Sequence, residues 1–485
     1  MPVPILSCIE IVIIMYIFLK KYTLKERFIK LIILLLIFEI IYPTGAFFQI
    51  GLVGFLSVYT VVQYVIGAYC IIEFIVGNLK IPNKLFVGLC VFFNVILFLL
   101  VIDYVYPYHG LVPYSAGRSP WDDFVTGKAG LEVYTADFSV FLISFLKLIN
   151  CAIVITVAKS LLDKNDLYFI LTRVVFWGRY YCWIGAFDFF MQNILDSSVL
   201  FYDMRDFICG VNSNHDFNHG IKKGNFYAIV GFAYENSNFV MSMFYLIISM
   251  LIKIKIDMKN KIRCRYNSKR YIIFSIILMM LSGGFSSIWY IGMTAVCWFL
   301  LRADIVNYSS EKKMKVYWRL VLGLILVIMV TYFIYTFSNF ENSYYGKRLA
   351  AVFTILDYFT SGHFAISLNQ EEVGVSDLSR LTSLLYGGLI ILERPLIGIG
   401  LGVMKIHDVT LCFIMSIGII GVLTWVMFVT LKKEKNIHFD FLFWATFYFW
   451  GGLPMGTLER SITNFYFIFI LLCTSLYCTK ESHTM

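Results

Sequence analysis

Apolar segments long enough to cross a lipid bilayer recur along this chain from its beginning to its end. A helical span needs about 20 mainly apolar residues. Of the 485 residues, 59% are hydrophobic and only 15% are charged. The mean hydropathy of +0.77 is too high for a soluble protein of this length. The chain is therefore predicted to be an all-α, polytopic integral membrane protein forming one membrane domain over residues 1–485.

The basic residues cluster in short connections between apolar segments. Lys253–Arg270 holds eight basic residues against one acid, Asp257. Such connections face the cytoplasm, which explains the net charge of +9 without a nucleic-acid partner. Three longer connections lack this basic excess, at residues 106–137, 195–225 and 339–407. We expect these three to be extracytoplasmic loops.

With the three loops outside, the alternation of sides holds for about 13 spans, with the N-terminus outside and the C-terminus inside. Met1–Leu19 has neither a basic start nor a cleavage site, so it is expected to be the first span. The expected spans are residues 3–19, 31–46, 50–76, 85–105, 138–160, 167–192, 226–251, 271–283, 286–301, 320–338, 408–430, 439–456 and 462–478.

The third outside loop, 339–407, has a helical pattern of its own. Leucines recur at helical spacing, which predicts an amphipathic helix along the outer leaflet. They are Leu381, Leu384, Leu385, Leu389 and Leu392. Pro395 would end this helix, and the glycines between Gly398 and Gly402 would form a tight turn leading back into the membrane.

Two residues are candidates for acid–base chemistry. His407 stands where the third loop enters a span, and a histidine there can take up a proton near neutral pH. A histidine with a water partner at the interface is the simpler explanation, and position alone favours it. Glu235, near the outer end of a span, could partner an arginine or a sugar hydroxyl.

Several arginines are expected on the outer side, where the positive-inside bias makes them unusual. Arginine binds phosphate through two parallel hydrogen bonds and keeps its charge. Contact with lipid head groups is the alternative explanation. The outer arginines are Arg348, Arg380, Arg394 and Arg460.

Other chemistries have little support in the sequence. His215 and His219 are four apart, a spacing that suits a metal site on a helix, but the nearby Asn and Gly residues favour a loop, so no metal site is expected. The eleven cysteines contain no Cys-x-x-Cys pair and imply no disulfide framework. The motifs of P-loop ATPases, serine hydrolases and zinc proteases do not occur, and no cofactor is expected.

Taken together, the C-terminal half resembles the superfamily of O-antigen polymerases and ligases, the Wzy-type and WaaL-type enzymes. The family pattern is an arginine, an amphipathic helix, a Pro-Leu-x-Gly-x-Gly turn, a histidine followed by an amide or hydroxyl residue, nine residues, and Gly-x-x-Gly. The matching residues are Arg380, Pro395–Gly400, His407, Asp408, Gly418 and Gly421, with the nine-residue spacer Val409–Ile417. Gly231–Ser237 is similar to an earlier Gly-x-x-x-Glu-Pro segment of the family, and Ser282–Ser287 to its serine-containing turn.

The sequence departs from the family pattern at four places. Asp408 replaces the usual amide or hydroxyl residue, Asn236 replaces a proline, and Ser287 stands where an arginine often follows serine. An arginine expected before the earlier segment is missing, and Lys222 or Lys223 would substitute for it.

The resemblance implies a metal-independent glycosyltransferase of the bacterial cytoplasmic (inner) membrane. Its donor would be a glycan on undecaprenyl pyrophosphate, and its acceptor a hydroxyl of the next lipid-linked repeat unit. His407 would be the base, and Arg380 with Arg394 or Arg348 would hold the pyrophosphate. Further candidates for substrate binding are Asp408, Arg460, Lys222 and Lys223, with Glu235 as the second catalytic candidate. A chain-length regulator, a flippase and membrane lipids would be its partners.

Three alternatives to a polymerase remain open at this stage. A ligase of the same superfamily shares the topology, although the two additional outside loops favour a polymerase. A polysaccharide transporter or flippase would suit the buried charges, but such proteins usually contain internal repeats, and none is visible. A structural subunit would not require His407 or Arg380.

Overall fold

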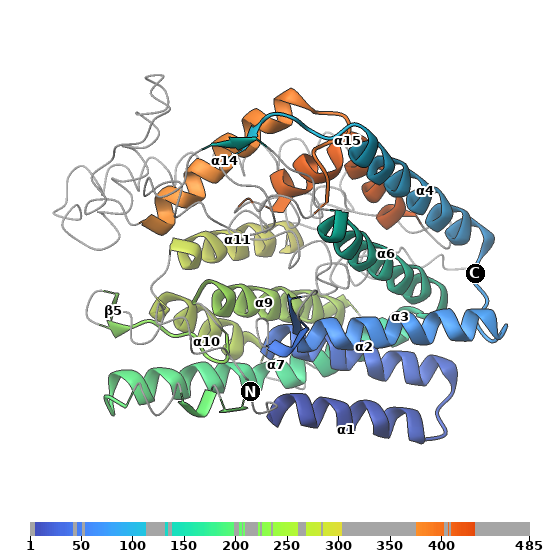
Figure 1. Ribbon diagram of the computed structural model, residues 1–485. Coiled ribbons are helices and arrows are strands. Elements are labelled where there is room, and N and C mark those ends of the chain that lie inside the picture. Colours follow the sequence, from blue (N-terminus) through green and yellow to red (C-terminus); the bar gives the residue numbers. More distant parts are fainter. Residues whose placement is uncertain are drawn as a thin grey trace.

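The computed structural model describes residues 5–41, 46–50, 54–112, 131–133, 138–197, 203–205, 207–208, 222–223, 226–233, 236–259, 268–282, 285–302, 375–401, 406 and 409–431. These residues form helices and three short antiparallel strand pairs (Figure 1). Within this described part of the chain, four helices are long and apolar enough to cross a membrane, which confirms the prediction of a helical chain with several such segments. The number of spans stays a prediction, because those expected at 320–338, 439–456 and 462–478 lie outside the described residues.

The helices follow the apolar segments of the sequence. They are α1 (Ile5–Leu19), α2 (Leu24–Ile41), α3 (Val58–Ile75), α4 (Asn83–Val105), α6 (Phe138–Leu161), α7 (Lys164–Asn193), α9 (Asn236–Lys259), α10 (Ser268–Leu281), α11 (Phe285–Arg302), α14 (Val375–Glu393) and α15 (Val409–Thr430). The strand pairs are β1 (Ala46–Ile50) with β2 (Gly54–Ser57), β3 (Leu111–Val112) with β4 (Glu132–Val133), and β5 (Lys222–Lys223) with β6 (Phe226–Tyr227).

Three expected span boundaries are wrong. The spans predicted at 31–46 and 50–76 meet in the hairpin of β1 and β2, so α2 ends at Ile41 and α3 begins at Val58. Apolar residues alone do not distinguish a strand from a helix, and the Pro and Gly residues between 43 and 54 favour turns. The span predicted at 226–251 begins as a helix only at Asn236, because β6 and a turn precede it.

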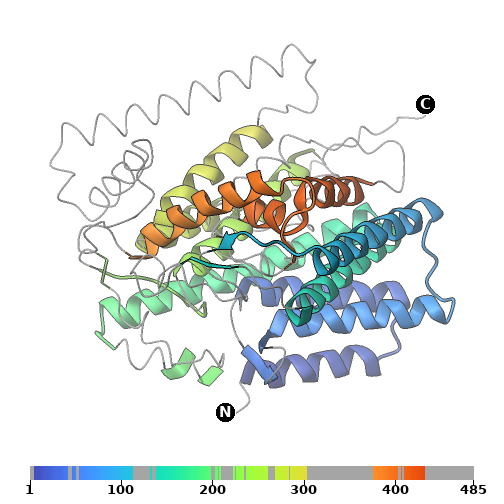
Figure 2. The same ribbon diagram turned by 45° about the horizontal axis from the view of Figure 1, so that its top comes forward.

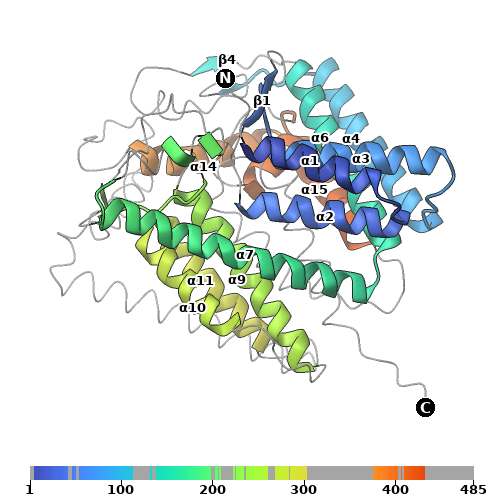
Figure 3. The same ribbon diagram turned by 90° about the horizontal axis from the view of Figure 1, so that it is seen from below.

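Helix α9 lies at the centre of one group of helices. It packs against α7, α10, α11 and α2, as seen from two directions (Figures 1 and 3). Most of its side chains are buried, whereas α4 exposes apolar side chains such as Val87, Phe98 and Val101. Apolar side chains on the outside are what a lipid-facing helix requires. One connected apolar core joins the helices around α9 to a second group, in which α4 packs against α6 and α15.

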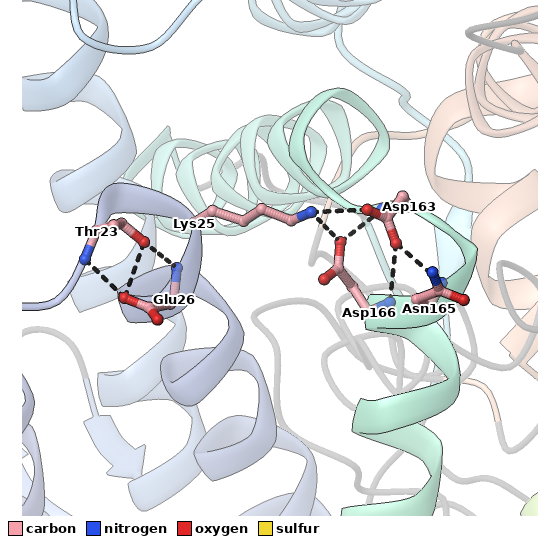
Figure 4. Close-up of polar contacts among 6 residues, drawn as sticks. All are labelled: Thr23, Lys25, Glu26, Asp163, Asn165 and Asp166. Carbon is pink, nitrogen blue, oxygen red and sulfur yellow. Dashed lines mark hydrogen bonds and ion pairs between the residues drawn. The ribbon is translucent and has the colours of Figure 1, made fainter.

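The beginnings of α2 and α7 are joined by polar contacts (Figure 4). Asp163 caps α7 by accepting from the backbone N–H of Asn165 and Asp166 at 2.9 and 3.0 Å. Lys25, in the first turn of α2, places its Nζ 2.8 Å from Asp163 Oδ2 and 2.6 Å from Asp166 Oδ2. The hydrogen bond from Lys25 lowers the pKa of Asp163 to about 2, and the two carboxylates raise the pKa of Lys25.

Candidate functional site

Helix α15 is broken in its middle, at Gly418. This residue has φ 64° and ψ −179°, which no α-helix allows and which side chains other than glycine rarely adopt. The break interrupts the hydrogen-bond ladder of a helix that is otherwise apolar enough to span a membrane. Because lipid offers no hydrogen bonds, the free backbone groups need partners within the protein.

The turn that follows α14 supplies those partners. On the first half of α15, the carbonyls of Met415 and Ser416 accept from the N–H groups of Ile399 and Gly400 at 2.8 and 3.0 Å. On the second half, the N–H groups of Ile419 and Ile420 donate to the carbonyls of Pro395 and Leu396 at 2.9 and 3.2 Å. The segment Pro395–Gly400 therefore completes the broken helix.

Glycine is required on both sides of this contact. A Cβ on Gly398 would lie 2.5 Å from the carbonyl oxygen of Met415 and 2.7 Å from the nitrogen of Gly418. A Cβ on Gly418 would lie 2.1 Å from the carbonyl oxygen of Leu396. One glycine of each sequence pattern, Gly398 of Pro-Leu-x-Gly-x-Gly and Gly418 of Gly-x-x-Gly, thus makes room for the backbone of the other segment.

Helix α14 confirms the predicted helix and its end before Pro395. The buried side of α14 includes polar residues, and some of its leucines are exposed. Thr382, Ser383 and Ile390 are buried, while Leu389 and Leu392 are 44% and 76% exposed. The exposed leucines are suited to contact lipid, as expected of a helix at a membrane surface. Figure 2 shows α14 leading toward α15, which packs against α4.

The residue before His407 lies against the middle of α14. A Cβ on Gly387 would be only 2.1 Å from Cδ1 of Ile406, which is fully buried. Arg380 and Arg394 stand seven positions before and after Gly387. Seven residues are close to two helical turns, so all three backbone positions fall on one side of α14. His407 itself and the side chain of Arg380 lie outside the described part of the structure.

Arg394 is held at the C-terminal end of α4. Its Nη2 donates to the backbone carbonyl of Tyr106 at 2.6 Å, and its guanidinium lies 5.3 Å from the centre of the Tyr106 ring. Nη1 is 4.0 Å from Oδ1 of Asp103, and both side chains are at most 10% exposed. Among the described residues, neither Nη1 of Arg394 nor Oδ1 of Asp103 has a hydrogen-bond partner, although both atoms are buried. The pair therefore retains hydrogen-bonding capacity.

A second contact joins the same two segments. The hydroxyl of Tyr108 donates to Oε2 of Glu393, and the Tyr108 side chain is buried. Burial raises the pKa of Tyr108, and the hydrogen bond to Glu393 raises it further. Tyr108 is thus a neutral donor at physiological pH, and it fixes the end of α14 to the segment that follows α4.

This geometry limits the role of Arg394. Fourteen positions separate it from Arg380. At about 1.5 Å per residue, the two backbone positions are about 21 Å apart along α14. Because Arg394 is also held by Tyr106, the geometry disfavours the expectation that both arginines grip one pyrophosphate. Arg348, the other expected partner, lies outside the described residues, as does Arg460.

Asp188 organises the segment that includes Glu235. Its Oδ2 accepts from the backbone N–H of Val230 and Gly231, both at 2.8 Å, and Oδ1 accepts from Gln192. Gly231 has φ 56°, and a Cβ there would be 2.9 Å from the ring of Phe239. The carboxylate thus fixes the turn before α9, while Glu235 and Asp408 fall outside the described residues.

The start of α9 meets the serine-containing turn after α10. Nδ2 of Asn236 donates to the carbonyl of Ser282 at 3.2 Å, and the hydroxyls of Ser282 and Ser287 are 2.9 Å apart. The two earlier segments of the family pattern are therefore in contact. Lys222 and Lys223 form the short strand β5, and their side chains are not among those described.

Sequence reasoning missed three residues of the site. Asp103 was detectable as the one acid in an uncharged apolar run, the type of residue that often has a function in membranes. Tyr106 and Tyr108 carry no such signal, since aromatic residues are common at membrane interfaces.

No protein-family model, curated protein or solved structure matches the chain.

Proposed function

We propose that this protein polymerises oligosaccharide repeat units carried on undecaprenyl pyrophosphate, at the outer face of the bacterial cytoplasmic membrane. The chain would cross the membrane in about 13 spans, with α14 on the outer surface. The product would be a surface polysaccharide such as O-antigen or capsule. The resemblance in sequence is the starting point of this proposal.

In the proposed reaction, a hydroxyl oxygen of the acceptor unit attacks the anomeric carbon of the donor glycan. The bond between that carbon and the pyrophosphate oxygen breaks, and the pyrophosphate leaves with the electron pair. His407 takes the hydroxyl proton as the general base. Arg380, together with Arg348, balances the negative charge that develops on the leaving group.

One observation carries the proposal furthest. Ile406 packs on the side of α14 that also holds Arg380, and His407 follows Ile406 directly. Gly387 and Arg380 are seven residues apart, or about 10 Å along the helix. A base and a phosphate-binding arginine on one side of a surface helix suit a substrate whose lipid part stays in the outer leaflet. Arg394 would then position α14 rather than bind the same pyrophosphate.

A transporter is the second candidate, because broken helices are typical of transporters and provide their binding sites. The break in α15 argues against this role, since four of its backbone groups at Gly418 are already hydrogen-bonded by Pro395–Gly400. A ligase of the same superfamily would use the same residues with a different acceptor.

Glycan length in cells tests the proposal. Cells lacking the protein would be complemented with wild type, His407→Ala, Arg380→Ala or the control His109→Ala, at matched membrane abundance. His109 follows α4 on the same outer side and has no role in the proposed reaction. We expect a ladder of lengths for wild type and the control, and single repeat units for the other two variants.

Other results would contradict part of the proposal or indicate a different function. A full ladder with His407→Ala would remove that residue as the base. A full ladder after deletion of the gene would exclude a polymerase. Loss of lipid-linked repeat units from the outer face would indicate a transporter, and a polymer that forms but is not attached would indicate a ligase.

A further inference from the structure

A groove lies between the first half of α4 and the last turns of α15. Its volume is about 840 Å³, within the range of small-molecule sites. The lining is mostly apolar and includes Val87, Val91 and Met427. These three side chains are 58%, 52% and 69% exposed. Both helices are among those able to span a membrane, so the apolar wall would lie at the depth of lipid chains.

The base of the groove is held rigidly. Leu431 packs over Gly88, where a Cβ would be 2.1 Å from Leu431 Cδ1. Lys159 of α6 donates to the carbonyls of Phe428, Val429 and Leu431 at 3.1, 2.6 and 2.9 Å. These three bonds satisfy carbonyls at the end of α15 that have no partner within the helix. The groove is therefore a fixed feature of the packing between α4, α6 and α15.

A positive charge stands at one end of this apolar wall. Lys84 lines the groove from the first turn of α4, and no ion pair to it is found among the described residues. Lys80 and Lys84 place this end of α4 on the cytoplasmic side by the positive-inside rule. Anionic lipids are attracted to basic residues at that surface.

We propose that this groove binds one anionic phospholipid of the cytoplasmic leaflet. Its phosphate would pair with Lys84, and the upper part of one acyl chain would lie along Val87, Val91 and Met427. Lys84 to Val91 covers seven residues, or about 10 Å of α4. The charge of Lys84 thus matches the phosphate of such a lipid, and the apolar wall beside it matches an acyl chain. This proposal does not depend on the reaction that the protein catalyses.

Thermal unfolding of the full-length, detergent-purified protein with added lipid tests this site. Phosphatidylglycerol would be compared with phosphatidylcholine of the same chain length. The variants would be Lys84→Gln, Val91→Trp, which fills the groove, and the control Lys164→Gln. Lys164 is also an exposed lysine in the first turn of a helix, but it does not line the groove.

We expect phosphatidylglycerol to stabilise wild type and Lys164→Gln more than phosphatidylcholine does. Lys84→Gln should weaken the apparent affinity for phosphatidylglycerol about fivefold, the effect of one lysine near an anionic membrane surface. Val91→Trp should abolish the difference between the two lipids. Equal stabilisation by both lipids in wild type, or an undiminished phosphatidylglycerol effect in either groove variant, would overturn the proposal.

Discussion

Gly398 and Gly418 meet at a distance that excludes a side chain on either residue. A Cβ on Gly398 would be 2.7 Å from the nitrogen of Gly418, and both residues have positive φ, 78° and 64°. The nearest atoms belong to backbone and cannot rotate away. The turn after α14 and the break in α15 are thus one structural unit.

Alanine at either glycine should destabilise the protein. A residue other than glycine at such φ values costs about 1–3 kcal/mol before the clash is counted. We expect Gly398→Ala and Gly418→Ala each to lower the free energy of unfolding by at least about 2 kcal/mol, measured by thermal unfolding in detergent. Gly388→Ala is the control, because a Cβ there meets nothing within 4 Å. Equal effects of all three would show that the contact is not tight.

The Asp188 carboxylate should be required for order in the turn before α9. Asp188→Leu leaves the N–H groups of Val230 and Gly231 buried without an acceptor, at a cost of about 1–3 kcal/mol each. We expect faster hydrogen exchange of these two amides and a lower melting temperature. Asp203→Leu, at an exposed position, serves as the control. Unchanged exchange rates would contradict the assigned role.

Lys159 should stabilise the end of α15. Lys159→Met keeps most of the side-chain volume but leaves the carbonyls of Phe428, Val429 and Leu431 without their donor. A buried carbonyl left without a donor costs about 1–3 kcal/mol, so we expect the free energy of unfolding to fall by roughly 2 kcal/mol. The comparison is Lys164→Met, which is exposed. If both substitutions have the same effect, Lys159 does not cap the helix.

The Lys25 bridge should contribute a small, pH-dependent stability. Folding lowers the pKa of Asp163 from its ordinary value of 3.8 to about 2. The stabilisation by the Asp163 carboxylate is therefore complete above pH 3.8 and is lost as the pH falls toward 2. The raised pKa of Lys25 keeps the bridge intact to about pH 10. Since Lys25 and Asp163 are substantially exposed, we expect their ion pair to contribute less than about 1 kcal/mol to the free energy of unfolding.

Unfolding measured against pH checks the bridge. The difference in melting temperature between wild type and Lys25→Met should be constant from pH 5 to 9. It should shrink below about pH 4 and in 1 M salt. Lys21→Met, at an exposed position beside α2, should show no such dependence. A difference that grows on acidification would contradict the assigned pKa of Asp163.

The apolar runs of the sequence were enough to predict most helices, because length and hydrophobicity are local properties. They failed at Ala46–Ser57, where an apolar hairpin replaces the expected helix, and before Asn236. The leucine spacing predicted α14, and Pro395 predicted its end. The side of α14 that is buried was not predictable, since Thr382 and Ser383 pack inward while Leu392 is exposed.

The sequence by itself determined that the chain is helical and apolar enough to cross a membrane, and it singled out the residues of the turn and of the Gly-x-x-Gly segment. Only the tertiary structure decided that the turn completes broken α15, that Asp188 fixes Gly231, and that Arg394 is held beside Asp103. The physical reason is that hydrophobic period and turn propensity act over a few neighbours. Pairing of buried polar groups depends on which distant segments pack together, and Asp103 and Arg394 are 291 residues apart.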